Sequence, residues 1–380
     1  MKTEKKTAFI YSPQFDGYEL GPHHPFKSAR SRVVYDLCNK LGLLSHPWMR
    51  VVEPKTLDAD TMTMFHDSDY LDALRDANDG VFREPMIMFN IGTGECPVFK
   101  GIYDYCALAA GASHKAMKML LDGEIDIAFS PTGGFHHAGR RHAEGFCYIN
   151  DIGVVIAELL AQDRRIAYVD IDAHHGNGIQ NEFYSDGRVL KISLHENGET
   201  LYPWGGFETE TGSGDGAMCN VNVPLPVGTD DEFFIRAFDE IVSPLLGAYD
   251  PDIVIGVIGT DSLAADPLTH LNLTNNGMSA AIKRMRDFGK PLMLLGGGGY
   301  NLESLARAWT LAWAILNDIE PEDRHVGTIG GVLLGDQEIA EGSLRDMRRF
   351  SSGPERNVIE GKIEHVTEFI KKNIFPAHGL

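Results

Sequence analysis

Two acidic side chains and a histidine alternate along the run YVDIDAHHGNG, as Asp170, Asp172 and His174. Residues two apart in an extended chain point to the same face, so these three side chains would lie together. Carboxylate oxygens and imidazole nitrogens are suitable ligands for Zn²⁺ or Fe²⁺. Such groups are costly to bury at the end of an apolar strand unless they are paired or bind a cation. The run therefore predicts a metal site, in preference to an N-capping aspartate followed by surface histidines.

A third ligand can come from another strand end. The run IVIGVIGTDSLAADPLTHLNLT places Asp261 just after a second apolar segment. With Asp172 and His174 it would complete three protein ligands, the number that leaves a position open for water and substrate in catalytic zinc sites. The alternative is that Asp261 caps a helix or lies in a turn. We interpret Asp266, before Pro267, as such a turn residue.

Two adjacent histidines, His136 and His137, follow the apolar segment DIAFS in the run PTGGFHHAGRRHAEGFCYIND. A neutral histidine near a metal-bound water can act as general base and later as general acid. Tandem histidines are often incidental, but a metal cluster at the same rim favours a catalytic role.

A run of four glycines precedes Tyr300 in LMLLGGGGYN. Consecutive glycines allow close backbone approach, and a tyrosine hydroxyl can donate a hydrogen bond to an oxyanion. The alternative is a phosphate-binding loop, but the run lacks both the Walker lysine and the GxGxxG spacing.

The elements that must position these residues alternate along the chain. Apolar runs predict strands over 8–11, 126–130, 165–172, 189–195, 253–258 and 291–295. Helical patterns cover 28–43, 100–121, 151–160, 230–246, 279–288, 302–316 and 358–372. Between them we expect a glycine-rich loop over 196–218 and a charged irregular segment over 335–357. The alternation predicts one large α/β domain over residues 1–380, with a parallel sheet covered on both faces and ligands at the carboxyl ends of its strands.

Composition excludes several classes of protein. The 380 residues carry a net charge of −20, which argues against nucleic-acid binding and anionic membrane surfaces. The charge suits cationic partners, or serves only solubility. Five cysteines without CxxC spacing, and no apolar run long enough for a signal peptide or membrane helix, indicate a cytoplasmic protein. The sequence does not indicate an oligomeric state.

Four motifs, in this order, resemble those of the zinc-dependent histone deacetylase family: GGFHHAGRRHAEGFCYIND, DIDAHHGNG, GTDSLAADPLTHLNL and GGGGYN. The segments FIYSP, HHPFKSARSR, FHDSDYLDAL and RAWTLAWAIL extend the resemblance over most of the chain. Details such as GECPVFKG, ISLHENG and DPLTHL are most similar to the bacterial acetoin-utilisation deacetylase branch. The resemblance implies an arginase-like α/β fold with an eight-stranded parallel sheet and helices on both faces. It also implies hydrolysis of an acetylated amine, usually acetyl-lysine, to acetate and free amine.

The resemblance further implies a role for each matching residue. The zinc ligands would be Asp172, His174 and Asp261. The catalytic groups would be His136, oriented by Asp170, together with His137 and Tyr300. The substrate tunnel would be formed by Gly145, Phe146 and Tyr202, with Leu268 near its mouth and Arg30 beneath an acetate-release cavity.

Two sites for a structural K⁺ or Na⁺ ion are also implied by the resemblance. The inner site would use Asp170, Asp172, His174, Ser193 and Leu194. The outer site would use Phe183, Asp186 and Val189.

The chain departs from the class I pattern at two positions. Asn177 stands where class I enzymes have an Asp partner for the second histidine, so we expect a lower pKa for His137. Glu95 replaces the Asp that holds the substrate backbone at the tunnel rim, which puts peptide-backbone recognition in doubt.

Rival functions remain open at this point. A ureohydrolase needs further acids for two metals, yet Gly176 follows the second histidine and Ser262–Leu263 follow Asp261. An acetylpolyamine deacetylase suits the acidic surface and Glu95, whereas Leu268 stands where an acidic gatekeeper would be expected. A catalytically silent acetyl-lysine binder is a third possibility. The acetoin branch suggests a metabolic enzyme, such as an acyl-CoA synthetase, as substrate rather than histones.

Overall fold

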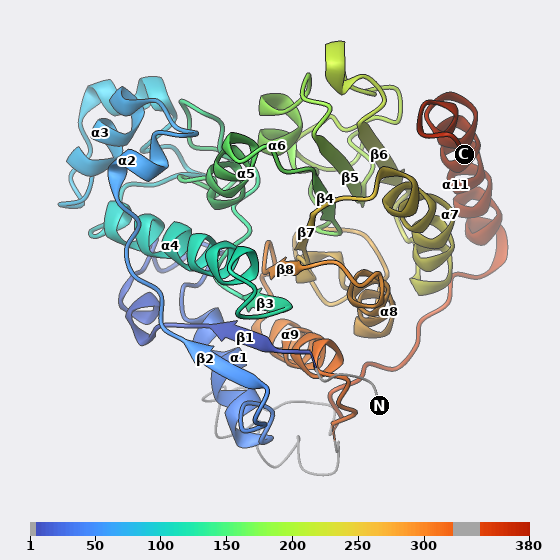
Figure 1. The fold of residues 1–380 in the computed structure, drawn as a ribbon, viewed down its shortest axis with the longest axis horizontal. Coiled ribbons are helices and arrows are strands. Elements are labelled where there is room, and N and C mark those ends of the chain that lie inside the picture. The colour runs from blue at the N-terminus through green and yellow to red at the C-terminus, as the bar shows by residue number, and fades with distance from the viewer. Residues whose placement is uncertain (1–4, 322–342) are drawn as a thin grey trace.

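An eight-stranded sheet forms the centre of the computed structural model, which describes residues 5–321 and 343–380 (Figure 1). All neighbouring strands pair in parallel. From one edge to the other the order is β2 (Met49–Val52), β1 (Thr7–Ile10), β3 (Ile127–Ser130), β8 (Leu292–Leu295), β7 (Ile253–Val257), β4 (Ile166–Asp170), β5 (Val189–Glu196) and β6 (Asn220–Leu225). The predicted eight-stranded parallel sheet is confirmed.

The sheet is buried on both faces, as its apolar strands require. Every residue of β1, β3, β4, β5, β6, β7 and β8 is buried, whereas the edge strand β2 exposes Arg50 and Val51. The two outermost strands, β2 and β6, escape prediction because MRVV and NVNVPL are short and interrupted by polar residues or proline.

Helices cover the two faces in separate groups (Figure 1). One face carries α4 (Ile102–Leu121), α5 (Asp151–Ala161) and α6 (Asn177–Glu182), with α2 (Ala59–Met62) and α3 (Ser68–Asp76) beyond them. The other face carries α1 (Arg30–Lys40), α9 (Leu302–Leu316), α8 (Asn275–Asp287) and α7 (Asp231–Tyr249). The final long helix, α11 (Gly353–Asn373), packs against α7 and β6. Short 3₁₀ helices span Pro13–Gly17, Glu84–Phe89, Gly214–Gly216, Thr260–Ser262 and Phe375–His378.

Side-chain caps decide where several helices begin. Asn301 accepts hydrogen bonds from the backbone amides of Glu303 and Ser304, so α9 starts at the predicted residue. Thr274 caps α8 in the same way, and the helix therefore begins four residues before the predicted start. Helix α11 also begins early, so residues 353–357 are helical rather than irregular; residues 335–342 of that predicted segment lie outside the described residues.

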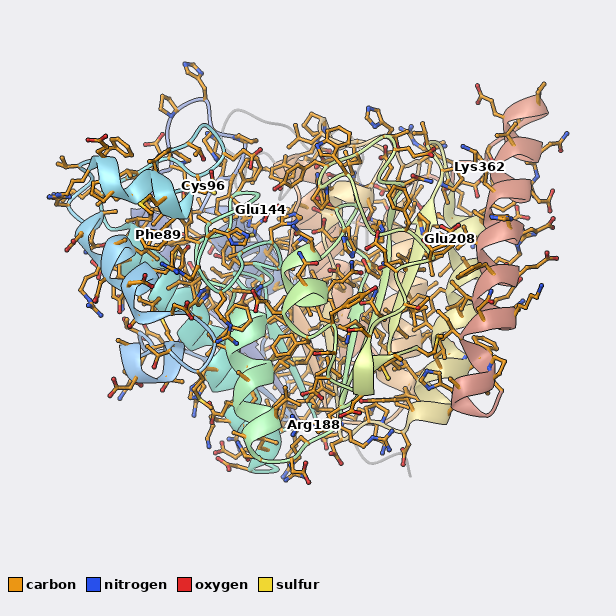
Figure 2. The ribbon with its side chains drawn as sticks, turned by 90° about the horizontal axis from the view of Figure 1, so that it is seen from above. Phe89, Cys96, Glu144, Arg188, Glu208 and Lys362 are labelled. Carbon is orange, nitrogen blue, oxygen red and sulfur yellow. The ribbon has the colours of Figure 1, made fainter. Side chains whose placement is uncertain are left out.

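The loops that follow the strands all lie at one edge of the sheet. They include 131–150 after β3, 171–176 after β4, 197–219 after β5 and 296–301 after β8. Figure 2 shows Glu144 toward this edge, whereas Arg188, just before β5, lies at the opposite edge. Among the described helices, none has the length and apolar character needed to cross a membrane.

Candidate active site

Asp172, His174 and Asp261 come together at the carboxyl ends of β4 and β7, which are neighbours in the sheet. Nδ1 of His174 lies 2.8 Å from Oδ2 of Asp261 and 3.2 Å from Oδ1 of Asp172. One ligand atom from each residue lies within 4.8 Å of the others, and all three side chains are buried. Two carboxylates and one imidazole at this spacing fit a divalent metal such as Zn²⁺.

The electrostatics of the triad favour a cation between its two acids. Burial lowers the pKa of His174, but the Asp261 and Asp172 carboxylates outweigh it and raise that pKa to about 10. The imidazole then carries a proton on the nitrogen that faces the two carboxylates, and a metal held by these three residues would have to replace this proton.

The glycine run after β8 explains how the backbone reaches the metal site. The backbone amide of Gly298 donates to Oδ2 of Asp172 at 2.6 Å. A Cβ atom at Gly298 would lie 2.0 Å from Oδ2 of Asp261, so no larger residue fits beside the triad. Because two carboxylates border the run, its surroundings would repel a phosphate.

His136 is paired with a buried carboxylate. Its Nδ1 donates to Oδ2 of Asp170 at 2.7 Å, and the hydroxyl of Tyr168 donates to the same oxygen. Burial lowers the pKa of His136, but Asp170 and Asp172 together raise it to about 9. The imidazole is therefore a cation at neutral pH.

His137 has a neutral partner instead. Its Nδ1 lies 2.7 Å from Oδ1 of Asn177, and its Nε2 lies 3.2 Å from Nε2 of His136. Burial, together with the charges of His136 and His174, holds the pKa of His137 well below its usual range. His137 is therefore neutral at pH 7, and its Nε2 accepts a hydrogen bond from the Nε2–H group of His136.

Tyr300 reaches the same cavity from the end of the glycine run. Its backbone amide donates to Oδ2 of Asp266 at 2.7 Å, so Asp266 anchors this segment and is more than the turn residue that the sequence indicates. Burial, followed by the charges of Asp261 and Asp172, raises the pKa of Tyr300 well above its usual range. The phenol therefore keeps its proton and remains a hydrogen-bond donor.

A narrow cavity leads to these groups. Its walls include most of the metal and histidine residues together with Arg30, Gly145, Phe146 and Tyr300. Gly145 has φ +53°, and a Cβ atom there would lie 2.4 Å from the ring of His137. Tyr202 contributes through an edge contact with the same ring, with centroids 5.5 Å apart.

Three of the residues predicted to bind substrate differ in burial: Arg30 is buried, whereas Leu268 and Glu95 are exposed. Arg30 is buried over the ring of Phe26, 4.2 Å from its centroid, with Nε and Nη1 lacking hydrogen-bond partners. Leu268 is 37% exposed and Glu95 is exposed; neither is among the residues that line the cavity. The carbonyl of Glu95 accepts from His24, whose ring packs on Phe146 at the rim.

The residues of the two predicted ion sites have different contacts. At the inner site, Asp170 and Ser193 are register partners on β4 and β5, and Ser193 also contacts His195. At the outer site, the carbonyl oxygens of Phe183 and Val189 both accept hydrogen bonds from the ammonium group of Lys191.

Comparison with known proteins decides the family. Residues 24–316 match the family model described as "Histone deacetylase domain". The chain belongs to the histone deacetylase family. Histone deacetylase clr6 of Schizosaccharomyces pombe is 38% identical over 316 residues, spanning 82% of this chain and 77% of that protein. Histone deacetylase 1 of Homo sapiens is 36% identical over 321 residues, spanning 84% of this chain and 66% of that protein.

Solved structures of this family share the fold. An HDAC homolog from Aquifex aeolicus superimposes with a TM-score of 0.87 at 30% identity, covering 96% of this chain and all of that one. A structure of an HDAC homolog complexed with SAHA gives a TM-score of 0.86 at the same identity. The deacetylase fold predicted for this chain is thereby confirmed.

Sequence reasoning misses four residues of this deacetylase site and its surroundings. Tyr168 lies two residues before Asp170 on one strand, so the alternation rule could have found it. Lys191 interrupts the apolar run VLKISLH, and the cost of burying a charge is a usable signal. Glu144 accepts a hydrogen bond from Asn177, and Asp266 accepts one from the backbone amide of Tyr300. Both contacts depend on loop paths that the sequence does not reveal.

Proposed function

We propose that this protein is a zinc-dependent deacetylase that hydrolyses acetyl-lysine side chains of proteins to acetate and free lysine. The observation that carries the proposal is the buried triad of Asp172, His174 and Asp261 at a narrow cavity shared with two histidines and a tyrosine. Bound zinc would polarise the acetyl carbonyl and acidify a water molecule. Iron(II) suits the same ligands.

The chain's own residues supply the proton transfers. His137 is neutral, so it takes the proton of the attacking water and later gives a proton to the leaving amine. His136 stays charged beside Asp170 and stabilises the negative transition state electrostatically. Tyr300 donates a hydrogen bond to the oxyanion that develops on the acetyl carbonyl.

The tunnel supports an uncharged, slender side chain as substrate. Phe146 packs edge-on against Tyr300 with centroids 5.7 Å apart, and Tyr202 borders His137. Aromatic walls along a narrow cavity suit an acetylated lysine and would penalise a free ammonium.

The proposal also covers the branch of the family, the cellular compartment, the extent of the domain and one bound ion. The motifs GECPVFKG and DPLTHL support the acetoin-utilisation branch, with an acetylated metabolic enzyme such as an acyl-CoA synthetase as substrate. Five buried free thiols support a reducing cytoplasm. The sheet and its helices draw on residues from Thr7 to Asn373, which supports one domain over 1–380. The inner ion site around Asp170 and Ser193 is proposed to hold K⁺ or Na⁺.

A second candidate function is deacetylation of acetylpolyamines. It is favoured by the exposed carboxylate of Glu95 near the rim and by the net charge of −20, which would attract a distal ammonium. It is opposed by Leu268, an apolar residue that the resemblance puts near the tunnel mouth.

The deciding experiment compares kcat/KM for acetyl-lysine peptides, N-acetylspermidine and peptides with longer acyl groups. At least a tenfold preference for acetyl-lysine peptides supports the proposal, and the reverse preference supports the polyamine function. Binding of acetyl-lysine without any turnover identifies a silent binder. Metal analysis accompanies the assay, because two metals per chain would instead indicate a ureohydrolase site.

A further inference from the structure

Lys191 is a buried basic residue inside β5, a strand that is buried along its whole length. It is the third residue of β5, and only 3% of it is exposed. Burying an ammonium group is costly unless hydrogen-bond acceptors replace the lost water. The residue is not among those that line the active-site cavity, so the proposed chemistry does not account for it.

The acceptors around this ammonium are backbone carbonyls. Nζ donates to the carbonyl oxygen of Phe183 at 2.6 Å and to that of Val189 at 3.0 Å. The nearby Asp186 carboxylate is engaged elsewhere, accepting from Nε and Nη2 of Arg188 at 3.1 and 2.7 Å. Lys191 is thus held by neutral oxygens that converge on one cation, as in a monovalent-ion site.

Phe183 and Val189 are two of the three residues that the family resemblance assigns to the outer K⁺ or Na⁺ ion. An ion bound to the same two oxygens would lie in van der Waals contact with the ammonium, and the two positive charges would repel each other strongly in a buried setting. The outer site as it stands therefore does not fit a free cation. Burial lowers the pKa of Lys191 to about 8, which still leaves the group mostly protonated at pH 7.

We infer that the ammonium group of Lys191 takes the place of the outer monovalent ion, so that this chain carries that cation as part of its own covalent structure. The ammonium ties together both ends of the turn from Phe183 to Val189, which joins α6 to β5. Helix α6 begins at Asn177, the partner of His137, and β5 carries Ser193. The connection between these two elements is thereby held without an ion taken from solution.

The location allows the inference to be tested apart from catalysis. Arg188, inside the same turn, lies at the edge of the molecule opposite Glu144 (Figure 2). Lys191→Thr removes the ammonium and leaves room for an ion on the two carbonyls. Lys283→Thr is the matched control, because this lysine is exposed on α8 and pairs with Asp287 in the next turn.

Two readouts decide the inference. Crystals soaked in thallium(I), whose anomalous signal reports a K⁺-like ion, should show no peak on the Phe183 and Val189 carbonyls of the wild type and a clear peak there in Lys191→Thr. Replacing choline chloride by KCl at equal ionic strength should raise the melting temperature of Lys191→Thr by about 3 °C more than that of the wild type or Lys283→Thr.

A thallium peak on these carbonyls in the wild type, with the lysine displaced, overturns the inference whether or not the variant folds. Equal responses to K⁺ in the variant and the wild type, without a thallium peak in the variant, also overturn it. A variant that folds only in KCl supports it.

Discussion

The carboxylate of Glu144 fixes which end of the Asn177 side chain faces His137. Nδ2 of Asn177 donates to Oε1 of Glu144 at 2.8 Å, which leaves Oδ1 to face Nδ1 of His137 at 2.7 Å. An ionised carboxylate can only accept, so the amide cannot turn over without losing this bond. Nδ1 of His137 must then carry the proton, and Nε2 is the nitrogen left to act as a base.

Replacing Glu144 by glutamine should therefore slow catalysis without removing any group from the metal site. The introduced amide donates or accepts, so it no longer imposes one orientation on Asn177. We expect kcat to fall about tenfold, the loss of ~1.5 kcal/mol from one charge-assisted hydrogen bond. His142→Gln is the control, because His142 contacts the other carboxylate oxygen, Oε2, at 3.0 Å. Unchanged kcat, with an unchanged His137 tautomer by ¹⁵N NMR, would contradict this role.

Asn177→Asp should raise the pKa of His137 only when Glu144 is changed as well. The single variant Asn177→Asp would place two carboxylates where a 2.8 Å hydrogen bond now lies, and one of them would be forced to take up a proton. In the double variant with Glu144→Gln, the introduced amide donates to the introduced carboxylate. That carboxylate should raise the pKa of His137 and move the acidic limb of the kcat/KM profile up by about one pH unit. A limb that stays in place in the double variant would show that the partner does not set this pKa.

Removing the hydroxyl of Tyr300 should lower kcat by ~10²–10³-fold, the usual loss for one oxyanion donor. KM should change little, because the hydrogen bond strengthens only as charge develops in the transition state. Steady-state kinetics of Tyr300→Phe test this, with Tyr103→Phe on α4 as a control outside the cavity lining. Full activity of Tyr300→Phe would rule out the proposed role.

A single methyl group at Gly298 should weaken metal binding. Alanine there would bring Cβ within 2.0 Å of Oδ2 of Asp261 and push this carboxylate out of place. We expect affinity for Zn²⁺ to fall at least ~10-fold, as for other residues that support metal ligands. Competition with a chelator measures the change. Gly247→Ala on α7 is the control, because a methyl group at that position would meet no neighbouring atom within 4 Å and alanine favours a helix.

The free energy of unfolding should fall in mild acid because of His66, a buried histidine outside the metal triad. Burial lowers the pKa of His66 to about 3. The backbone amide of Asn150 donates to Nε2 of this neutral ring. The unfolded chain takes up a second proton on this ring below pH 6.5 and the folded chain does not, so unfolding becomes easier as pH falls. One such site costs about 2 kcal/mol between pH 6.5 and pH 5.

Urea unfolding of His66→Gln at the two pH values measures this contribution. The variant should be less stable overall, yet it should lose about 2 kcal/mol less than the wild type over this interval. His365→Gln serves as the reference, because this side chain on α11 is 76% exposed. Identical pH dependence in wild type and His66→Gln would contradict the assignment.

The sequence predicts best the parts of the fold that follow from continuous apolar runs. Six of the eight strands and the long helices α4, α7 and α9 are recognisable because their residue types already indicate burial. The edge strand β2 and the short helix α6 are not, because four to six residues with mixed polarity fit several conformations equally well.

Within the site, the sequence predicts the groups that stand at strand ends. Asp172 and Asp261 meet because β4 and β7 are neighbours in a parallel sheet, a relationship that alternating strands and helices already favour. The contact of Glu144 with Asn177 depends on the exact path of a 20-residue loop after β3. The hydrogen bonds of Lys191 depend on where two carbonyls point, and residue types alone do not encode this.

The position of β8 has a consequence for how the protein is made. Among the strands in the described residues it is the last to leave the ribosome, yet it pairs with β3 on one side and β7 on the other, near the middle of the sheet. Until about residue 295 is available, β3 and β7 each lack a neighbour, and Gly298 cannot reach Asp172. The nascent chain therefore cannot complete its metal site in stages, and cotranslational folding must keep two open strand edges apart from other chains until β8 arrives.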